Sequence, residues 1–247
     1  GGGRSSGRET IGRVAAVAIA EEVLKSLGIH VQAYTRSIGG IYIDETKASL
    51  DNIMKSPLYM PDLDASEKAE LLLEQKMKEQ DSAGGVIECV VRGMPAGIGE
   101  PVFEKLDANL AKAVMSIGAV KGVEIGDGFA VASAFGSDNN DSFVAAENGS
   151  IAKKTNHAGG ILGGMSDGSD IILRAAVKPT PSIARKQQTV NRDGEDIEIS
   201  IKGRHDPVIV PRAVVVVEAM SAFCVLDMVL LGMTSRLDKI QEFWKRQ

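Results

Sequence analysis

The sequence predicts an α+β fold built on antiparallel strands. Runs with helical periodicity and runs with alternating apolar residues both occur, but without the regular strand–helix alternation of a doubly wound parallel sheet. The turn Gly126-Asp127-Gly128 separates two strand-like runs, as a β-hairpin does. No Gly-x-Gly-x-x-Gly pattern follows a strand and no Walker A pattern occurs, so the common nucleotide-binding folds are disfavoured.

The chain opens with a predicted helix and strand. Ser6 and Glu9 have the spacing of a capping box, and Gly28 ends the helix that they begin. The apolar residues at helical spacing, expected to face the core, are Ile11, Val14, Ala15, Ala18, Ile19 and Leu24. Apolar residues alternate over 29–35 and predict a half-buried strand.

The next segments predict two helices and three strands. Residues 46–55 favour a short surface helix, and residues 64–79 a longer amphipathic one that begins at Asp64. Residues 85–93 are strand-like, residues 106–115 helical, and residues 120–125 a strand that turns back as a second strand over 129–135. Residues 137–154 are polar and predict a mobile loop or lid.

The last third predicts two strands and two helices. The strands cover 171–177 and 196–201, and the second is entered through the turn at 191–194. An apolar helix follows Pro211; because it carries Glu218 and Asp227, a buried helix is a better interpretation than a membrane span. Residues 237–247 predict a packed C-terminal helix.

Composition limits the classes of function. The 247 residues suffice for one large domain or two small ones, and 44% hydrophobic with 25% charged residues is typical of a soluble globular protein. A net charge of -5 argues against a nucleic-acid partner, whose phosphates reward dense Lys and Arg. Cys89 and Cys224 lack metal-ligand spacing and are interpreted as buried thiols in a reducing cytoplasm. The first residues do not resemble a signal peptide, so none is expected.

Four short motifs suggest an anionic ligand. They are Gly1-Gly2-Gly3-Arg4-Ser5-Ser6 before the first helix, Gly159-Gly160-Ile161-Leu162-Gly163-Gly164, Lys178-Pro179-Thr180-Pro181-Ser182, and Gly203-Arg204-His205-Asp206-Pro207. Glycines allow a close backbone approach, and the cations, hydroxyls and helix N-terminus suit a phosphate. Each motif has an alternative: a capped helix after a flexible loop, a tight loop, a solvated turn and a surface charge cluster, respectively.

Longer motifs in the same order resemble the chorismate synthase family. They include Gly-Gly-Gly-Arg-Ser-Ser-Gly-Arg-Glu-Thr from Gly1, Met-Pro-Ala-Gly-Ile-Gly-Glu-Pro-Val-Phe from Met94, Val-Lys-Gly-Val-Glu-Ile-Gly-Asp-Gly-Phe from Val120, Gly-Ser-Asp-Asn-Asn-Asp from Gly136, Asn-His-Ala-Gly-Gly-Ile-Leu-Gly-Gly from Asn156, Lys-Pro-Thr-Pro-Ser-Ile from Lys178 and Lys-Gly-Arg-His-Asp-Pro from Lys202. Several such motifs together are far more specific than one alone.

The resemblance implies a fold, a reaction and partners. The fold is a layer of helices sandwiched between antiparallel sheets, here expected as one domain over residues 1–247. The implied reaction removes the 3-phosphate and a C6 hydrogen from 5-enolpyruvylshikimate 3-phosphate, giving chorismate in the shikimate pathway. It requires reduced FMN without net redox change, in a cytoplasmic homotetramer. Whether an NADP-dependent activity of the protein itself reduces the flavin stays open.

The resemblance also implies site residues. The expected FMN contacts are Arg4, Ser5, Ser6, Gly118, Ala119, Gly163, Lys178, Pro179, Thr180, Pro181, Ser182 and Arg204. Asp206 resembles the family's aspartate that acts in the proton transfer. No metal is implied. The expectation is that all these groups converge on one cavity.

One departure from the family keeps alternatives open. The family motifs Gly-Glu-Ser-His-Gly and Gly-His-Ala-Asp, which supply two catalytic histidines, are absent, so the chain is expected to be N-terminally incomplete and to turn over little substrate alone. A binding module for flavin or a phosphate ligand, without catalysis, is the first alternative. A phosphosugar isomerase that uses Asp206 and His157 is the second and weaker one.

Overall fold

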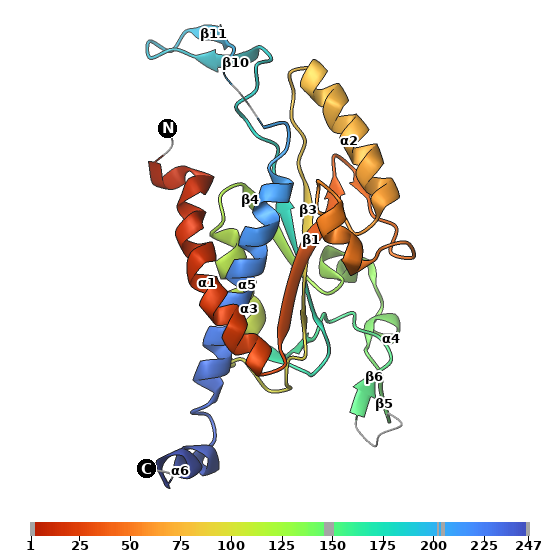
Figure 1. Cartoon of the computed structure of the whole chain (residues 1–247), viewed down its shortest axis with the longest axis vertical. Coiled ribbons are helices and arrows are strands. Elements are labelled where there is room, and N and C mark those ends of the chain that lie inside the picture. Colours follow the sequence, from red (N-terminus) through yellow and green to blue (C-terminus); the bar gives the residue numbers. More distant parts are fainter. Residues whose placement is uncertain (1–2, 146–150, 202, 204–205, 246–247) are drawn as a thin grey trace.

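A five-stranded antiparallel sheet forms the centre of the molecule (Figure 1). The structure, a computed structural model, describes residues 3–145, 151–201, 203 and 206–245. The strands lie in the order β2 (Ile41–Tyr42), β1 (His30–Ile38), β3 (Gly85–Arg92), β9 (Ile171–Val177) and β4 (Val120–Ile125). Every pairing is antiparallel, which confirms the predicted α+β class.

The register gives the sheet two distinct ends. Gly85 pairs with both Ile38 and Val177, and Val177 pairs with Val120. We call this end of the sheet, where these four strands begin or finish, the Val177 end. At the opposite end of the strands Val91 pairs with Ile171, so we call it the Ile171 end.

Three helices cover one face of the sheet. Helix α5 (Val210–Gly232) lies between α1 (Thr10–Ser26) and α3 (Leu106–Met115), and α1 and α5 run from the Val177 end toward the Ile171 end (Figure 1). Alternate strand residues such as Ile87 and Leu173 point into this interface and are buried. The core is almost entirely aliphatic, and removing that apolar surface from water is the main stabilising contribution. The described residues contain no second large sheet on the outer side of the helices.

Helix α1 buries a stripe that matches the predicted one only in part, at Leu24 and at the partly buried Val14. Val17, Ala20 and Leu24 are buried, whereas Ile11 and Ile19 are 77% and 74% exposed. The helix carries apolar residues on several sides, so periodicity alone could not select the side that packs on α5. The capping box is also only half formed: Ser6 Oγ accepts the Arg8 N–H, but the carboxylate of Glu9 pairs with Arg13 instead of reaching back.

Helix α5 is long and apolar enough to cross a membrane by length and composition. In the fold it is the central core helix, with ten buried residues that include Val217 and Cys224. Glu218, half-way along it, accepts hydrogen bonds from the Ala33 N–H at 2.6 Å and from Gln32 Nε2 at 2.9 Å. The prediction of a buried helix is therefore confirmed. Burial also raises the pKa of the Cys89 and Cys224 thiols to about 12, as expected for unreactive core cysteines.

The sheet face opposite the helices carries a row of charges. Glu88 on β3 is only 5% exposed and accepts hydrogen bonds from Tyr34 Oη, Arg36 (2.8 Å) and Arg174 (2.7 Å) on the two neighbouring strands. Arg174 also lies 3.7 Å from Glu124 on β4. Burial and the Glu88 carboxylate raise the pKa of the Tyr34 hydroxyl, which therefore stays protonated. The row links four strands.

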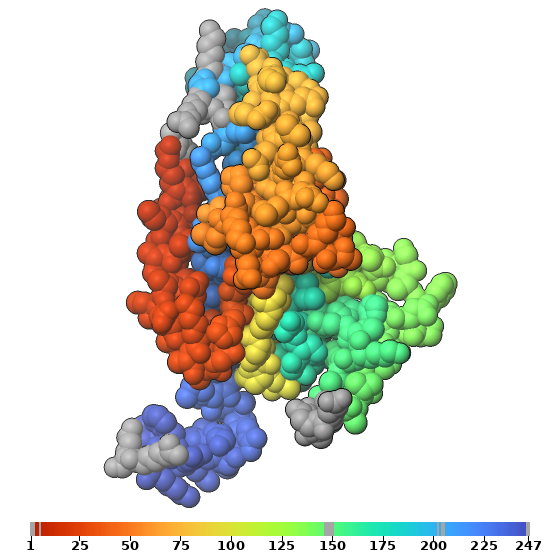
Figure 2. Space-filling view, turned by 45° about the vertical axis from the view of Figure 1, so that its right-hand side comes forward, coloured from red at the N-terminus to blue at the C-terminus, as the bar shows by residue number. Residues whose placement is uncertain are grey.

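Two regions differ from the sequence prediction. The expected strand at 129–135 is a 3-10 helix, η4 (Gly128–Ser133), because β4 pairs with the distant β9 instead of folding back as a hairpin. The expected loop at 137–154 contains α4 (Gly136–Asn139) and a hairpin of β5 (Phe143–Ala145) and β6 (Ile151–Lys153), which projects beside the sheet (Figure 2). Strands β7 (Ile161–Leu162) and β8 (Met165–Ser166) form another short hairpin at the Ile171 end.

The remaining elements lie at the periphery. The predicted surface helices appear as η3 (Leu50–Lys55) and α2 (Leu63–Lys78), the second capped by Asp62 rather than beginning at Asp64. Strands β10 (Gln187–Val190) and β11 (Asp196–Ile199) form an arm that projects beyond the Val177 end (Figure 1). Helix α6 (Leu237–Lys245) was predicted to be packed, but none of its described residues is buried.

Candidate functional site

Most of the predicted cofactor residues gather at the Val177 end. Ala119 precedes β4 and Lys178 follows β9, and the Lys178 N–H donates to the Ala119 carbonyl oxygen at 3.0 Å. Ala119 has a φ of +74°, a left-handed conformation that is strained for a residue with a Cβ and that recurs at functional sites. Gly118 and Lys178 are exposed beside it. Two of the predicted segments, 59 residues apart, are thus adjacent.

Helix α1 begins at the same end of the sheet. Arg4 and Ser5 lie in the 3-10 turn η1 (Gly3–Ser5), and Ser6 caps the next turn, η2 (Gly7–Glu9). Arg13, one α-helical turn further on, donates to Ser116 Oγ at 2.7 Å. This contact ties the start of α1 to the turn that carries Gly118 and Ala119.

The 178–182 segment carries a buried hydroxyl that has no partner. Lys178, Pro179 and Pro181 are exposed, whereas Thr180 is half-buried. The hydroxyl oxygen of Thr180 is inaccessible to water and forms no hydrogen bond with the described residues. Buried polar atoms are nearly always hydrogen-bonded, so this oxygen lacks a partner that a folded chain normally supplies.

Asp206 lines a cavity with Ile183 and Ala184, the two residues that follow this segment. Its carboxylate is 2.5 Å from the guanidinium of Arg212 in the first turn of α5. A cavity of about 170 Å³ separates it from the end of α2 and the base of the arm, and the lining residues are Met77, Gln80, Asp81, Ile183, Ala184, Asp206 and Pro207. Arg204, another predicted contact, lies outside the described residues.

The Val177 end has the electrostatics of an anion site. Both α1 and α5 begin there, and free N–H groups at helix N-termini favour negative charge. The exposed ammonium of Lys178 and the exposed guanidinium of Arg4 add two cations. This arrangement can hold the phosphate of a ligand. The carboxylate of Asp206 lies at the same end of the sheet.

Gly163 does not join this site within one chain. It lies in the turn between β7 and β8, at the Ile171 end. The neighbouring Gly164 packs against the side chain of Lys105, and the Leu106 N–H donates to the Gly164 carbonyl oxygen at 2.8 Å. Gly159 packs directly on the backbone of Gly126, where a Cβ would clash. Gly159 and Gly164 therefore serve close packing, whereas a Cβ on Gly163 would meet nothing within 4 Å. Within one chain this motif does not share a cavity with the residues at the Val177 end.

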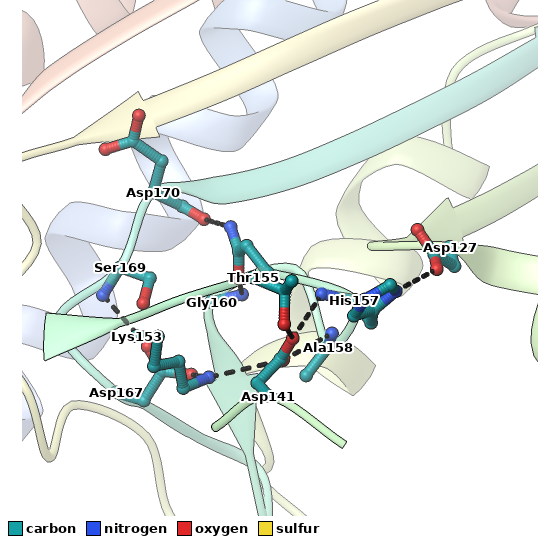
Figure 3. Close-up of polar contacts among 11 residues, drawn as sticks. Asp127, Asp141, Lys153, Thr155, His157, Ala158, Gly160, Asp167, Ser169 and Asp170 are labelled. Carbon is teal, nitrogen blue, oxygen red and sulfur yellow. Dashed lines mark hydrogen bonds and ion pairs between the residues drawn. The ribbon is translucent and has the colours of Figure 1, made fainter. Parts of the chain in front are cut away.

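A polar cluster holds the glycine run in place (Figure 3). Asp141 accepts the N–H groups of His157 (2.7 Å) and Ala158 (3.0 Å) and the hydroxyl of Thr155 (2.8 Å). The buried ammonium of Lys153 lies 3.5 Å from Asp141 and 2.5 Å from Asp167. The cluster thus pins the β5–β6 hairpin to the loops around it.

His157 is part of the same structure and not of the Asp206 site. Its Nδ1 lies 2.7 Å from Asp127 Oδ2, and this hydrogen bond raises the pKa of the imidazole. His157 and Asp206 lie at opposite ends of the sheet. This separation removes the support for an isomerase that would use both residues.

We expect Asp141 to give a measurable acid dependence of stability. Burial alone would raise the pKa of its carboxyl group, but the two N–H groups, the Thr155 hydroxyl and Lys153 lower it from 3.8 to about 2. A carboxyl group with a depressed pKa stabilises the fold above its unfolded pKa. We therefore expect a contribution of about 2 kcal/mol at neutral pH to disappear between about pH 4 and pH 2.

Urea unfolding of the wild type and Asp141→Asn at pH values from 7 down to 2 measures that contribution. The variant should be less stable at pH 7, and its difference from the wild type should shrink toward pH 2. A difference that stays constant with pH would contradict the assignment to the carboxylate.

Sequence reasoning missed the loop at 80–84, between α2 and β3. Ser82 Oγ donates to the Thr180 carbonyl oxygen at 2.7 Å, and the Ala83 N–H donates to the Pro207 carbonyl oxygen at 2.8 Å. Arg13 and Ser116 were also not predicted. All three contacts join segments at least 98 residues apart in the sequence and involve common residue types, so no local pattern could have shown them.

These observations define a class: an α+β protein with an anion-binding site at one end of an antiparallel sheet. The sequence model of the chorismate synthase family matches residues 1–230. The chain is 64% identical over 246 residues to a chorismate synthase of Lachnoclostridium phytofermentans and 62% identical to one of Agathobacter rectalis, covering 100% of this chain and 67% of each relative. A chorismate synthase of Archaeoglobus fulgidus is 54% identical over 234 residues, 94% of this chain and 65% of the relative.

The structural comparison agrees. A crystal structure of chorismate synthase superposes with a TM-score of 0.78 at 28% identity, over 98% of this chain and 69% of that one. The chain belongs to the chorismate synthase family. The family resemblance drawn from the motifs is thereby confirmed.

Proposed function

We propose that the protein forms chorismate and inorganic phosphate from 5-enolpyruvylshikimate 3-phosphate, with reduced FMN as cofactor. Membership of the family makes it a lyase of the shikimate pathway. The observation that carries the finer proposal is the meeting of Ala119, the 178–182 segment and Asp206 at the Val177 end. A binding module without catalysis is not favoured, since relatives at 62–64% identity over the whole chain are named as the enzyme.

The residues at this end fit a phosphate-bearing flavin. The exposed Lys178 and the strained turn at Ala119 form a polar surface to which an anionic ligand can bind, and the buried hydroxyl of Thr180 has no hydrogen-bond partner among the described residues. We propose that Arg4, Ser5, Ser6, Gly118, Ala119 and residues 178–182 hold the cofactor, with Arg204 entering from the adjoining segment. Gly163 is not included in this set for a single chain.

The reaction divides into two bond changes. The C3–O bond breaks and phosphate leaves with the bonding electrons, and C6 loses a proton whose electrons form the new double bond. When bound, the reduced flavin supplies an electron-rich ring that eases the departure of phosphate.

Asp206 is the proposed base that receives the C6 proton. A carboxylate is a weak base for a carbon acid, so the proton must become acidic before it moves. Loss of phosphate first provides that acidity. The Arg212 guanidinium at 2.5 Å holds the Asp206 carboxylate in place at the start of α5.

An anaerobic assay tests the proposal. The protein is mixed with 5-enolpyruvylshikimate 3-phosphate and either dithionite-reduced or oxidised FMN, and chorismate and phosphate are both measured. We expect equal amounts of the two products with reduced FMN only, and stronger activity from a chain extended at its N-terminus by the family's histidine motifs. Ligand binding without product in both chains would favour the binding module, and product without flavin would exclude this mechanism.

We also propose that the active form is a cytoplasmic homotetramer. The reduced state expected of the two buried thiols is consistent with a reducing compartment. Native mass spectrometry of the purified protein tests the assembly: a tetramer is expected, and a persistent monomer with full activity would contradict it.

A further inference from the structure

The loop at 80–84 contacts two parts of the proposed site: the 178–182 segment and the segment that carries Asp206. Gln80 and Asp81 line the cavity beside Asp206. Ser82 binds the Thr180 carbonyl oxygen, and the Ala83 N–H binds the Pro207 carbonyl oxygen. The loop therefore connects the 178–182 segment with the segment that carries Asp206. In the sequence, the arm of β10 and β11 separates these two segments.

Two features show that this loop is closely fitted. A Cβ on Gly84 would lie 2.6 Å from the Val177 carbonyl oxygen and 3.0 Å from Pro179 Cδ, so only glycine allows this approach. Gln80 has a φ of +59°, one of three non-glycine residues with positive φ among the described residues, and its carbonyl oxygen accepts the Arg185 N–H at 3.4 Å. Local strain of this kind persists only where the surroundings fix the backbone.

Among the described residues, Ser82 is the only side chain of this loop that hydrogen-bonds to the 178–182 segment. Its hydroxyl donates to the Thr180 carbonyl oxygen at 2.7 Å, and its N–H donates to Asp81 Oδ1 at 2.8 Å. Thr180 is flanked by two prolines, which have no N–H and so add no backbone donor to hold the segment. The Ser82 bond thus sets the orientation of the peptide that carries the unpartnered Thr180 hydroxyl.

We propose that Ser82 is a positioning residue for ligand binding: it holds Thr180, and with it the Lys178 to Ser182 backbone, in the geometry that receives the ligand's phosphate. This inference rests on the proposed function. Ser82 acts through Thr180 and does not itself touch the ligand.

The test compares three variants with the wild-type protein. Ser82→Ala removes the hydrogen bond, and Ser82→Thr retains the hydroxyl. Ser26→Ala is the matched control, because Ser26 Oγ also donates to a backbone carbonyl oxygen, that of Val23 at 2.6 Å, at the far end of α1. The dissociation constant of FMN is measured by flavin fluorescence, and the backbone protection of residues 178–186 by hydrogen exchange.

We expect Ser82→Ala to raise the FMN dissociation constant about 5- to 10-fold and to speed exchange in residues 178–186, at an unchanged Tm relative to Ser26→Ala. Ser82→Thr should bind within about 2-fold of the wild type. Equal affinities of Ser82→Ala and the wild type, or an equal loss in Ser26→Ala, would overturn the proposal.

The outcomes separate this inference from the proposed function. If the wild-type protein binds no FMN, the proposed function fails, and exchange still decides whether Ser82 holds the segment: faster exchange in Ser82→Ala alone supports that contact, and unchanged exchange refutes it. If the wild type binds FMN and Ser82→Ala binds it equally well, only the role of Ser82 is refuted.

Discussion

Replacing Glu88 by alanine is expected to lower the free energy of unfolding by about 3–5 kcal/mol, the largest loss of stability predicted for a single site. The carboxylate is 5% exposed and accepts bonds from Tyr34, Arg36 and Arg174. Without it two partly buried guanidinium groups face each other across β3 with no carboxylate between them. Urea unfolding at neutral pH measures the change.

An exposed ion pair provides the control for Glu88. Glu198 on β11 lies 2.9 Å from Lys186, and both side chains are about half or more exposed. Because water and salt screen such pairs, Glu198→Ala should cost less than about 1 kcal/mol. If Glu88→Ala costs no more than this control, the charge row does not stabilise the sheet.

Asp206→Asn is expected to reduce kcat about 100- to 1000-fold and to leave the FMN dissociation constant within about 3-fold of the wild type. The amide keeps the size and the hydrogen-bonding oxygen that face Arg212 but cannot accept the C6 proton.

Lys178→Met should show the opposite pattern, a weaker ligand complex with a smaller change in kcat, because it removes charge from the phosphate site.

Anaerobic steady-state rates and flavin fluorescence on the same preparations measure both quantities. Asp193→Asn, at the exposed turn of the arm, is the control and should match the wild type in each. An Asp206→Asn variant with near wild-type kcat would show that another group takes the proton.

Elements with strong local patterns were predicted well. The bounds of α3, β4 and β9 agree with periodicity, and β3 differs by one residue at its end. The hairpin expected after Gly128 is absent because β4 finds its partner in β9, more than forty residues later, and a glycine turn carries no information about so distant a strand. Ile11 and Ile19 of α1 show the same limit, since the residues that a helix buries depend on its neighbours.

Only part of the candidate site could be predicted, because a motif does not show which distant segments lie next to it in the fold. The motifs with Lys178 and Asp206 were recognised, and the structure brings them to one end of the sheet. Gly163 was grouped with them because glycine serves a ligand and a close backbone contact equally well. Packing explains Gly159, which contacts the backbone of Gly126, whereas Gly163 has open space around it and a positive φ that suits a turn. Ser82 and Arg13 act through long-range hydrogen bonds that leave no pattern in the sequence.

Hydrogen exchange of the protein with and without reduced FMN, under anaerobic conditions, tests most directly where the ligand binds. We predict slower exchange in residues 116–120 and 178–183, at the Val177 end, and unchanged exchange in residues 155–166. Protection confined to residues 155–166, with none at the Val177 end, would contradict the placement of the site.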